Sequence, residues 1–133
     1  MLRTKSQVSL ELMAFTGIIM LMLVMYTPIF WQQERAIIFE REDLIGNAIA
    51  LSIEKEVNTA VRFGSGYSRN FTLPERILSK DYNITIYNES RILSVDWYGG
   101  GVNRQLITPK IIGSPSPGQN RIENVNGVVI FNG

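Results

Sequence analysis

An uncharged apolar stretch near the N-terminus constrains the fold of this chain more than any other feature. Residues 12–31 form a run of twenty amino acids without an Asp, Glu, Lys or Arg. As an α-helix rising about 1.5 Å per residue, the run would be roughly 30 Å long, the thickness of a bilayer's hydrocarbon core. It is rich in Leu, Ile and Met, which disfavours the buried core helix of a soluble domain. The run therefore predicts a hydrophobic helix that needs lipid or other chains around it.

The flanks of this run predict its orientation in a membrane. Arg3 and Lys5 precede it, and Tyr26 and Trp31 lie toward its far end. Basic residues favour the cytoplasmic side, and Tyr and Trp favour the membrane–water interface. A secretory signal peptide is disfavoured, because its apolar region would be only about 7–15 residues long and a small-x-small cleavage site would follow. We expect everything after Trp31 to lie outside the cytoplasm.

Composition excludes several functional classes. The 133 residues carry a net charge of +1 with scattered basic residues, so no nucleic-acid surface is predicted. The chain has no cysteine, which excludes disulfides and thiolate metal sites. It also has no histidine, the usual general base and the commonest metal ligand. We expect a protein that is not an enzyme and that holds no metal or cofactor.

Glu11 places a carboxylate directly before the uncharged run, within the segment Gln7-Val8-Ser9-Leu10-Glu11. An acidic side chain at the centre of a span costs about 2.5 kcal/mol or more, and less toward the edge. There it complements the positive end of the helix dipole. It also follows Gln7 by four residues, the spacing at which two helical side chains are neighbours. The alternative is a plain anchor whose carboxylate lies among the lipid headgroups.

The QxSxE pattern, between a basic leader and an uncharged span, resembles the class III signal peptide of archaeal type IV-like pilins. The resemblance implies that a prepilin peptidase cuts between Ser6 and Gln7, discards residues 1–6 and leaves the hydrophobic helix on the mature protein. Gln7, Ser9 and Glu11 would then form the processing and assembly motif. Glu11 would meet the newly exposed amine of Gln7, either its own or that of a neighbouring subunit.

The same resemblance implies a function and partners. The chain would be inserted in the membrane as a precursor and then polymerise into an extracellular filament that serves adhesion or surface attachment. Its partners would be identical or related pilins, the prepilin peptidase, a pilus assembly ATPase and its membrane platform protein, with no nucleic acid. The main alternative is a single-pass anchored binding protein that does not polymerise, and a weaker one is an enzyme outside the cytoplasm.

Residues 7–31 are expected to continue as an amphipathic helix over residues 32–63. Pro28 lies inside the hydrophobic part, where it removes a backbone hydrogen bond and distorts the helix. Bacterial type IV pilins often carry such a proline at a similar position. The later part has an apolar stripe, with charged residues including Glu42 expected on the exposed surface. The stripe consists of Ile45, Ile49, Ile53, Val57 and Val61, with Ala48 and Ala60 beside it.

Residues 64–133 predict a small antiparallel β head packed on the C-terminal half of the helix, an α+β fold. Alternating segments at 82–87 and 92–98 flank a four-residue turn, and the glycines at 99–101 turn the chain into the next strand. Asn126-Gly127 predicts a tight hairpin near the end. Residues 113–118 are expected to form a surface loop. Four or five strands are predicted, in an order that resembles the heads of small archaeal pilins.

Three N-x-S/T sequons predict surface glycosylation, at Asn70, Asn83 and Asn88. We expect Asn70 in a loop, Asn88 in a turn and Asn83 on the strand face that points away from the core, because it alternates with Ile84. The alternative is that these are ordinary turn and edge asparagines without a glycan.

Overall fold

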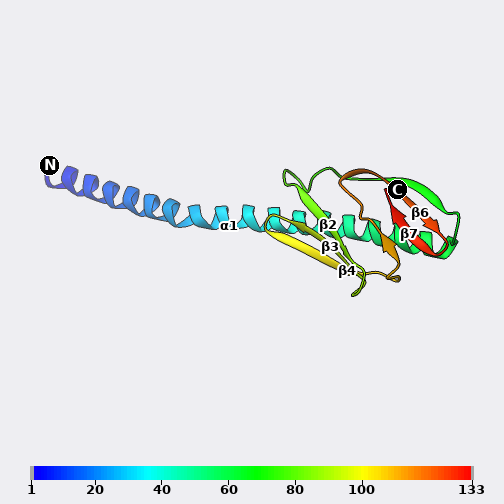
Figure 1. Ribbon diagram of the computed structural model, residues 1–133. Helices are drawn as coiled ribbons and strands as arrows, with labels where there is room; N and C mark the ends of the chain where they lie inside the picture. Colours follow the sequence, from blue (N-terminus) through cyan, green and yellow to red (C-terminus); the bar gives the residue numbers. More distant parts are fainter. Residues whose placement is uncertain (1, 133) are drawn as a thin grey trace. The chain divides into compact units, whose positions relative to one another are not determined.

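The computed structural model describes the backbone of residues 2–132 and the side chains of residues 6–132. Within these residues the chain forms one helix, α1 (Leu2–Phe63), followed by seven strands. The strands are β1 (Ser68–Leu73), β2 (Tyr82–Tyr87), β3 (Ile92–Trp97), β4 (Gly100–Gln105), β5 (Ile111–Ile112), β6 (Gly118–Val125) and β7 (Val128–Phe131). Figure 1 shows the elements in chain order, and the predicted α+β class is confirmed.

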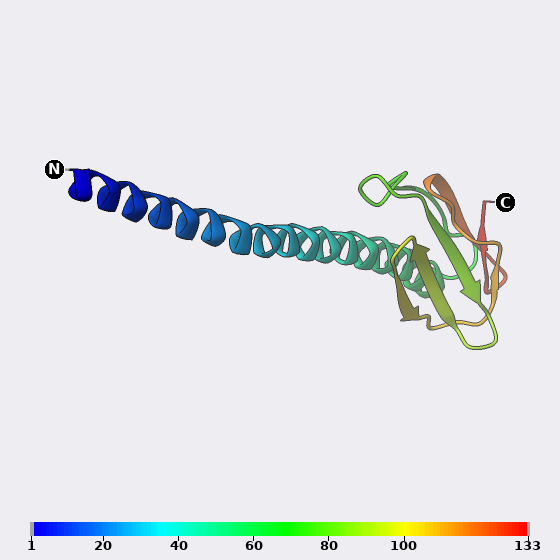
Figure 2. The ribbon, with the colours of Figure 1, turned by 90° about the vertical axis from the view of Figure 1, so that its left-hand side faces the viewer.

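The described residues fall into two compact units. The first consists of α1 up to Phe39, where α1 is the sole element. The second starts at Glu40 and contains the rest of α1 together with all the strands that the structure describes. A sheet of order β1-β6-β7-β5 and a sheet of order β2-β3-β4 make up its β structure. Both views show strands beside the C-terminal turns of α1 (Figures 1 and 2).

The later part of α1 supplies one side of the core of the second unit. Ile49, Ile53, Val57 and Ala60 are buried, which confirms the predicted apolar stripe. Ala48 is exposed, contrary to the prediction. The buried face of the helix extends instead toward Ala50, which lies on the opposite side of the stripe from Ala48 and is fully buried. The remaining core side chains come from both sheets and from the segments between them: Leu73, Ile77, Tyr82, Ile84, Leu93, Val95, Trp97, Leu106, Ile111, Ile122, Val129 and Phe131.

The helix ends at Phe63, where the sequence predicted its end. Gly64 follows with a φ of +78°, the left-handed conformation that terminates many helices and that glycine adopts without a steric penalty. Its N–H donates to the carbonyl of Ala60 at 3.1 Å. The side-chain amide of Asn124 on β6 donates to the same carbonyl at 2.9 Å. The helix C-terminus is thus bound to the sheet that passes it.

Each of the three predicted turns joins a pair of antiparallel strands. β2 pairs antiparallel with β3 across the turn at 88–91, and β6 pairs antiparallel with β7 across Asn126-Gly127. Both residues of that second turn have positive φ values, 53° and 84°, as a type I′ turn requires. Of the three glycines at 99–101, Gly99 lies in the turn, whereas the other two already belong to β4 and pair with β3. The prediction that the whole triplet forms the turn was wrong.

Within residues 2–132, seven strands form where four or five were predicted, and their pairing is antiparallel as predicted, except between β5 and β7. Asn70 was expected in a loop, but its segment forms β1, which pairs with β6 and has mostly exposed side chains. β5 has two residues, too few for an alternation signal, and runs parallel to β7. The predicted loop at 113–118 is shorter by one residue, since Gly118 begins β6, and Pro115 within it is buried.

Candidate functional site

The first unit presents an apolar surface along α1. Its large apolar side chains are about half to three-quarters exposed, from Val8 at 65% to Phe39 at 52%. Among the residues from Ser6 on, α1 is long and apolar enough to cross a membrane, and none of its most apolar window is buried. A helix that is apolar all round requires lipid or other protein chains to cover it. This surface fits insertion into a membrane or assembly with other chains.

The motif residues lie at the start of this surface. Ser6, Gln7, Ser9 and Glu11 are all on α1 and all exposed. Gln7 and Glu11 are one helical turn apart, so their side chains share a face. The peptide bond between Ser6 and Gln7 is helical in the uncut chain. Within the described residues, no hydrogen bond or ion pair involves the Glu11 carboxylate. Cleavage and pairing with an amine remain predictions.

Pro28 lies inside α1, as predicted. It has no N–H to donate to the carbonyl of Val24, four residues earlier. The hydroxyl of Thr27 donates to this carbonyl at 3.3 Å and to that of Leu23 at 2.8 Å. The single hydroxyl proton is shared between the two carbonyls, so it partly replaces the donor that proline removes. This matters in lipid because no water can donate to the carbonyl of Val24 there. The sequence signal for this role is the adjacent pair Thr27-Pro28.

The three sequon asparagines are exposed on the second unit. Asn70 lies on β1, not in a loop as predicted. Asn83 lies on the exposed face of β2 and Asn88 in the turn after it, where both were expected. The Asn88 amide donates to the carbonyl of Ile111 at 2.8 Å. One N–H of a glycosylated amide would still be available for this bond.

Glu42 corrects the prediction that it lies on the exposed surface. It is 2% exposed, and its carboxylate is paired with the ammonium group of Lys80 at 2.8 Å. Lys80 also donates to the carbonyl of Tyr98 at 2.9 Å. Glu42 lies seven residues before Ile49, a spacing that puts both on one helix face. A carboxylate on the buried face of a helix needs a cation beside it, so the position of Glu42 in the sequence indicated an ion pair.

Gly46 and Gly100 lie against the indole ring of Trp97. A Cβ atom on Gly46 would be 2.4 Å from Cη2 and from Cζ3 of the ring, and one on Gly100 would be 2.8 Å from Cζ2. Since such distances are far below van der Waals contact, neither position has room for a side chain. Glycine inside a helix usually weakens it, but Gly46 is where α1 and β3 make close contact.

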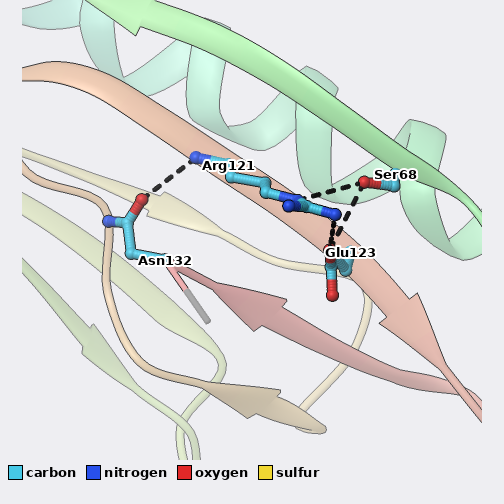
Figure 3. Close-up of polar contacts among 4 residues, drawn as sticks. All are labelled: Ser68, Arg121, Glu123 and Asn132. Carbon is cyan, nitrogen blue, oxygen red and sulfur yellow. Dashed lines mark hydrogen bonds and ion pairs between the residues drawn. The ribbon is translucent and has the colours of Figure 1, made fainter.

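A polar network joins β1, β6 and the residue after β7 (Figure 3). Arg121 forms an ion pair with Glu123 and donates through Nε to the Ser68 hydroxyl at 3.3 Å. Its backbone N–H donates to Oδ1 of Asn132 at 3.0 Å. Beside it lies an open hollow of about 440 Å³ lined by Asn70, Phe71, Thr72, Gln119, Asn120, Arg121 and Asn132.

The buried side-chain amide of Asn120 in this hollow forms all of its hydrogen bonds within the protein. Asn120 donates to the carbonyls of Ser116 and Gly118 and accepts from the backbone N–H of Ser116 and from the amide of Asn132. Both of its N–H groups and its oxygen are therefore in use. We assign the network a structural role, holding the loop before β6 against the strand.

The described residues contain no group of three or more His, Cys, Asp or Glu side chains arranged to hold a metal ion.

The topology is pilin-like: a long apolar N-terminal helix packs through its later part on small, mostly antiparallel sheets. No protein-family model, curated protein or solved structure matches the chain.

Proposed function

We propose that this chain is a structural subunit of an archaeal type IV-like surface filament, assembled from a membrane-inserted precursor and serving adhesion or surface attachment. The observation that carries the proposal is the exposed apolar surface of α1 between Val8 and Phe39. Burying a large apolar side chain contributes about 1.5–3 kcal/mol. The free energy lost by leaving all of these side chains in water would therefore exceed the net stability of a domain, which is about 5–15 kcal/mol. Lipid covers the surface before assembly, and neighbouring subunits cover it afterwards.

The motif at the start of this surface supports the filament. A prepilin peptidase would cut before Gln7 and create an amine one helical turn from Glu11. In a filament, where lipid is absent, the Glu11 carboxylate neutralises that amine on its own chain or on the next subunit. The role is assembly rather than catalysis. The partners are the peptidase, the assembly ATPase with its platform protein, and copies of this or related pilins.

The exposed asparagines on the second unit support a glycosylated coat. Asn70, Asn83 and Asn88 all point to solvent, so each is open to modification. Glycopeptide mass spectrometry of the native protein tests each position separately. Unmodified peptides at all three would remove the glycan from the proposal without affecting the filament.

The competing function is a membrane-anchored binding protein that keeps its helix in lipid. The two are distinguished by the N-terminus after co-expression with an archaeal prepilin peptidase. Mass spectrometry should find Gln7 first, while an inactive peptidase should leave the leader in place. A chain that keeps its leader beside active peptidase would favour the anchor.

A second experiment tests Glu11 in filament assembly. Glu11→Ala leaves the amine of a packed subunit without its partner, and breaking a buried charge pair costs about 3 kcal/mol or more. Filament yield should therefore fall at least about a hundredfold, while the precursor still inserts into the membrane. The matched control is Glu34→Ala, an exposed carboxylate on the same helix. Normal filament yield from Glu11→Ala would refute the role given to this residue.

A further inference from the structure

A groove lies on α1 at the outer end of the uncharged run. It is lined by Thr27, Pro28, Trp31, Gln32 and Arg35 and has a volume of about 370 Å³. Trp31 is 67% exposed, and Arg35 brings a positive charge to the lining. We propose that this groove binds the phosphate headgroup of a lipid in the extracytoplasmic leaflet. The inference rests on the proposed membrane insertion, which the filament precursor and the anchored alternative share.

The depth of Arg35 fits that of a lipid phosphate. The uncharged run ends at Trp31, and Arg35 follows one helical turn later, about 6 Å further along the axis. The headgroup region extends about 5–7 Å beyond the hydrocarbon core on each side of a bilayer. With the run spanning the core, the guanidinium therefore lies at the level of the phosphates.

The side chains around the groove suit this ligand. Trp31 and Arg35 are four residues apart, so they are neighbours on one helix face. An indole ring favours the membrane interface, and a planar guanidinium donates two parallel hydrogen bonds to a phosphate. The amide of Gln32 adds a further donor. The Thr27 hydroxyl already donates to the carbonyls of Leu23 and Val24, so it is not counted among the ligand contacts.

Two local features keep the groove open and positive. Pro28 contributes a compact ring and no long side chain to the lining of the groove. Glu34 precedes Arg35 in sequence but is turned about 100° around the helix. It does not belong to the groove lining. The carboxylate is therefore placed away from the phosphate that Arg35 would bind.

The experiment uses the full chain, freed of lipid in a neutral detergent and studied by native mass spectrometry. The probes are phosphatidylglycerol, diacylglycerol with the same acyl chains, and inorganic phosphate. The variants are Arg35→Gln and the control Arg41→Gln, which removes the same charge from an exposed position outside the groove. A basic residue at the membrane surface changes affinity about fivefold. Phosphatidylglycerol binding should weaken by about that factor in Arg35→Gln and stay at the original level in Arg41→Gln.

The other probes and a flotation assay complete the test. Diacylglycerol should bind the original chain and Arg35→Gln equally, because it has no phosphate. Inorganic phosphate that displaces the lipid at equal concentration would overturn the lipid assignment. Equal losses of phosphatidylglycerol affinity in Arg35→Gln and Arg41→Gln would show an effect of net charge alone, and would also overturn the proposed site. Flotation with vesicles should show insertion of all three chains. Absent insertion contradicts both the proposed membrane stage and the groove, whereas insertion with unchanged Arg35→Gln affinity overturns the groove alone.

Discussion

The ammonium group of Lys80 lies 2.8 Å from both carboxylate oxygens of Glu42. The carboxylate belongs to α1 and the ammonium to the segment before β2, and the same ammonium binds the carbonyl of Tyr98 after β3. One cation therefore joins three parts of the second unit that are far apart in sequence. The charge of Glu42 is buried, and Lys80 compensates it.

Removing one partner of this pair should destabilise the second unit strongly. Lys80→Met leaves the Glu42 carboxylate buried and uncompensated, so the free energy of unfolding should fall by about 3 kcal/mol. The double variant Glu42→Leu/Lys80→Met should recover most of that loss. Urea unfolding followed by near-ultraviolet circular dichroism gives these values. The control is Arg76→Met, whose pair with Asp81 is exposed and contributes at most about 1 kcal/mol. Equal losses in the single and double variants would contradict a charge effect.

Gly46→Ala should destabilise the protein even though alanine favours helices by about 1 kcal/mol over glycine. The new Cβ would be 2.4 Å from two atoms of the Trp97 ring. Overpacking of this kind costs about 1–3 kcal/mol, so the melting temperature of the second unit should fall. The control is Gly17→Ala, where no atom lies within 4 Å of the added Cβ. A rise in melting temperature for Gly46→Ala would show that the ring moves aside freely.

Thr27→Val should loosen α1 around Pro28. Valine has nearly the same shape but no hydroxyl, so the carbonyl of Val24 loses the donor that replaces the proline N–H. Hydrogen bonds between polar groups in membranes contribute about 0.6–1.7 kcal/mol. Amide hydrogen exchange in detergent should therefore accelerate by about threefold or more near residues 24–31.

Two further variants separate this effect from general loss of a threonine. Thr16→Val removes a hydroxyl bound to the carbonyl of Leu12, which still has the backbone N–H of residue 16 as its helical donor. Its exchange rates should stay close to the original. Thr27→Val/Pro28→Ala restores the missing N–H and should reverse the acceleration. Fast exchange that persists in the double variant would contradict the compensation.

The stability of the protein should depend on Tyr82 at alkaline pH. Burial raises the pKa of its phenol above the ordinary value of 10.0. Above pH 10 the unfolded chain therefore releases this proton before the folded chain does, and the free energy of unfolding falls as pH rises, by at most about 1.4 kcal/mol per pH unit. Tyr82→Phe removes this contribution, although it also removes the hydrogen bond to the carbonyl of Pro74. Parallel alkaline curves for Tyr82→Phe and the original chain would contradict the assignment.

Much of the fold could be predicted because its signals are local. The four-residue spacing from Ile45 to Val57, the glycine after Phe63 and the Asn126-Gly127 turn each encode their structure within a few residues. The exposed apolar surface of α1 follows in the same way from the uncharged run. Of the candidate site, the positions of Asn83 and Asn88 could be predicted from strand alternation and turn composition.

The remaining features depend on distant partners. β1 is polar because most of its side chains face solvent, and it becomes a strand by pairing with β6, with Ser68 opposite Glu123. Glu42 looks like a surface residue until Lys80 meets it, and Gly46 looks like a helix weakness until Trp97 packs on it. In each case the structural role of a residue depends on a contact with a segment that lies tens of positions away in the sequence.

The place of β7 in its sheet has a consequence for the order of folding. β7 is the last of the seven strands within residues 2–132, yet it lies between β6 and β5 in the interior of the sheet. Until residues 128–131 have been synthesised, β5 has no neighbour to pair with and β6 lacks one of its two. β1 and β6 can pair before β7 is made, but the four-stranded sheet cannot be completed until β7 is available. A premature stop before β7 would therefore leave the C-terminus of α1 without a completed sheet.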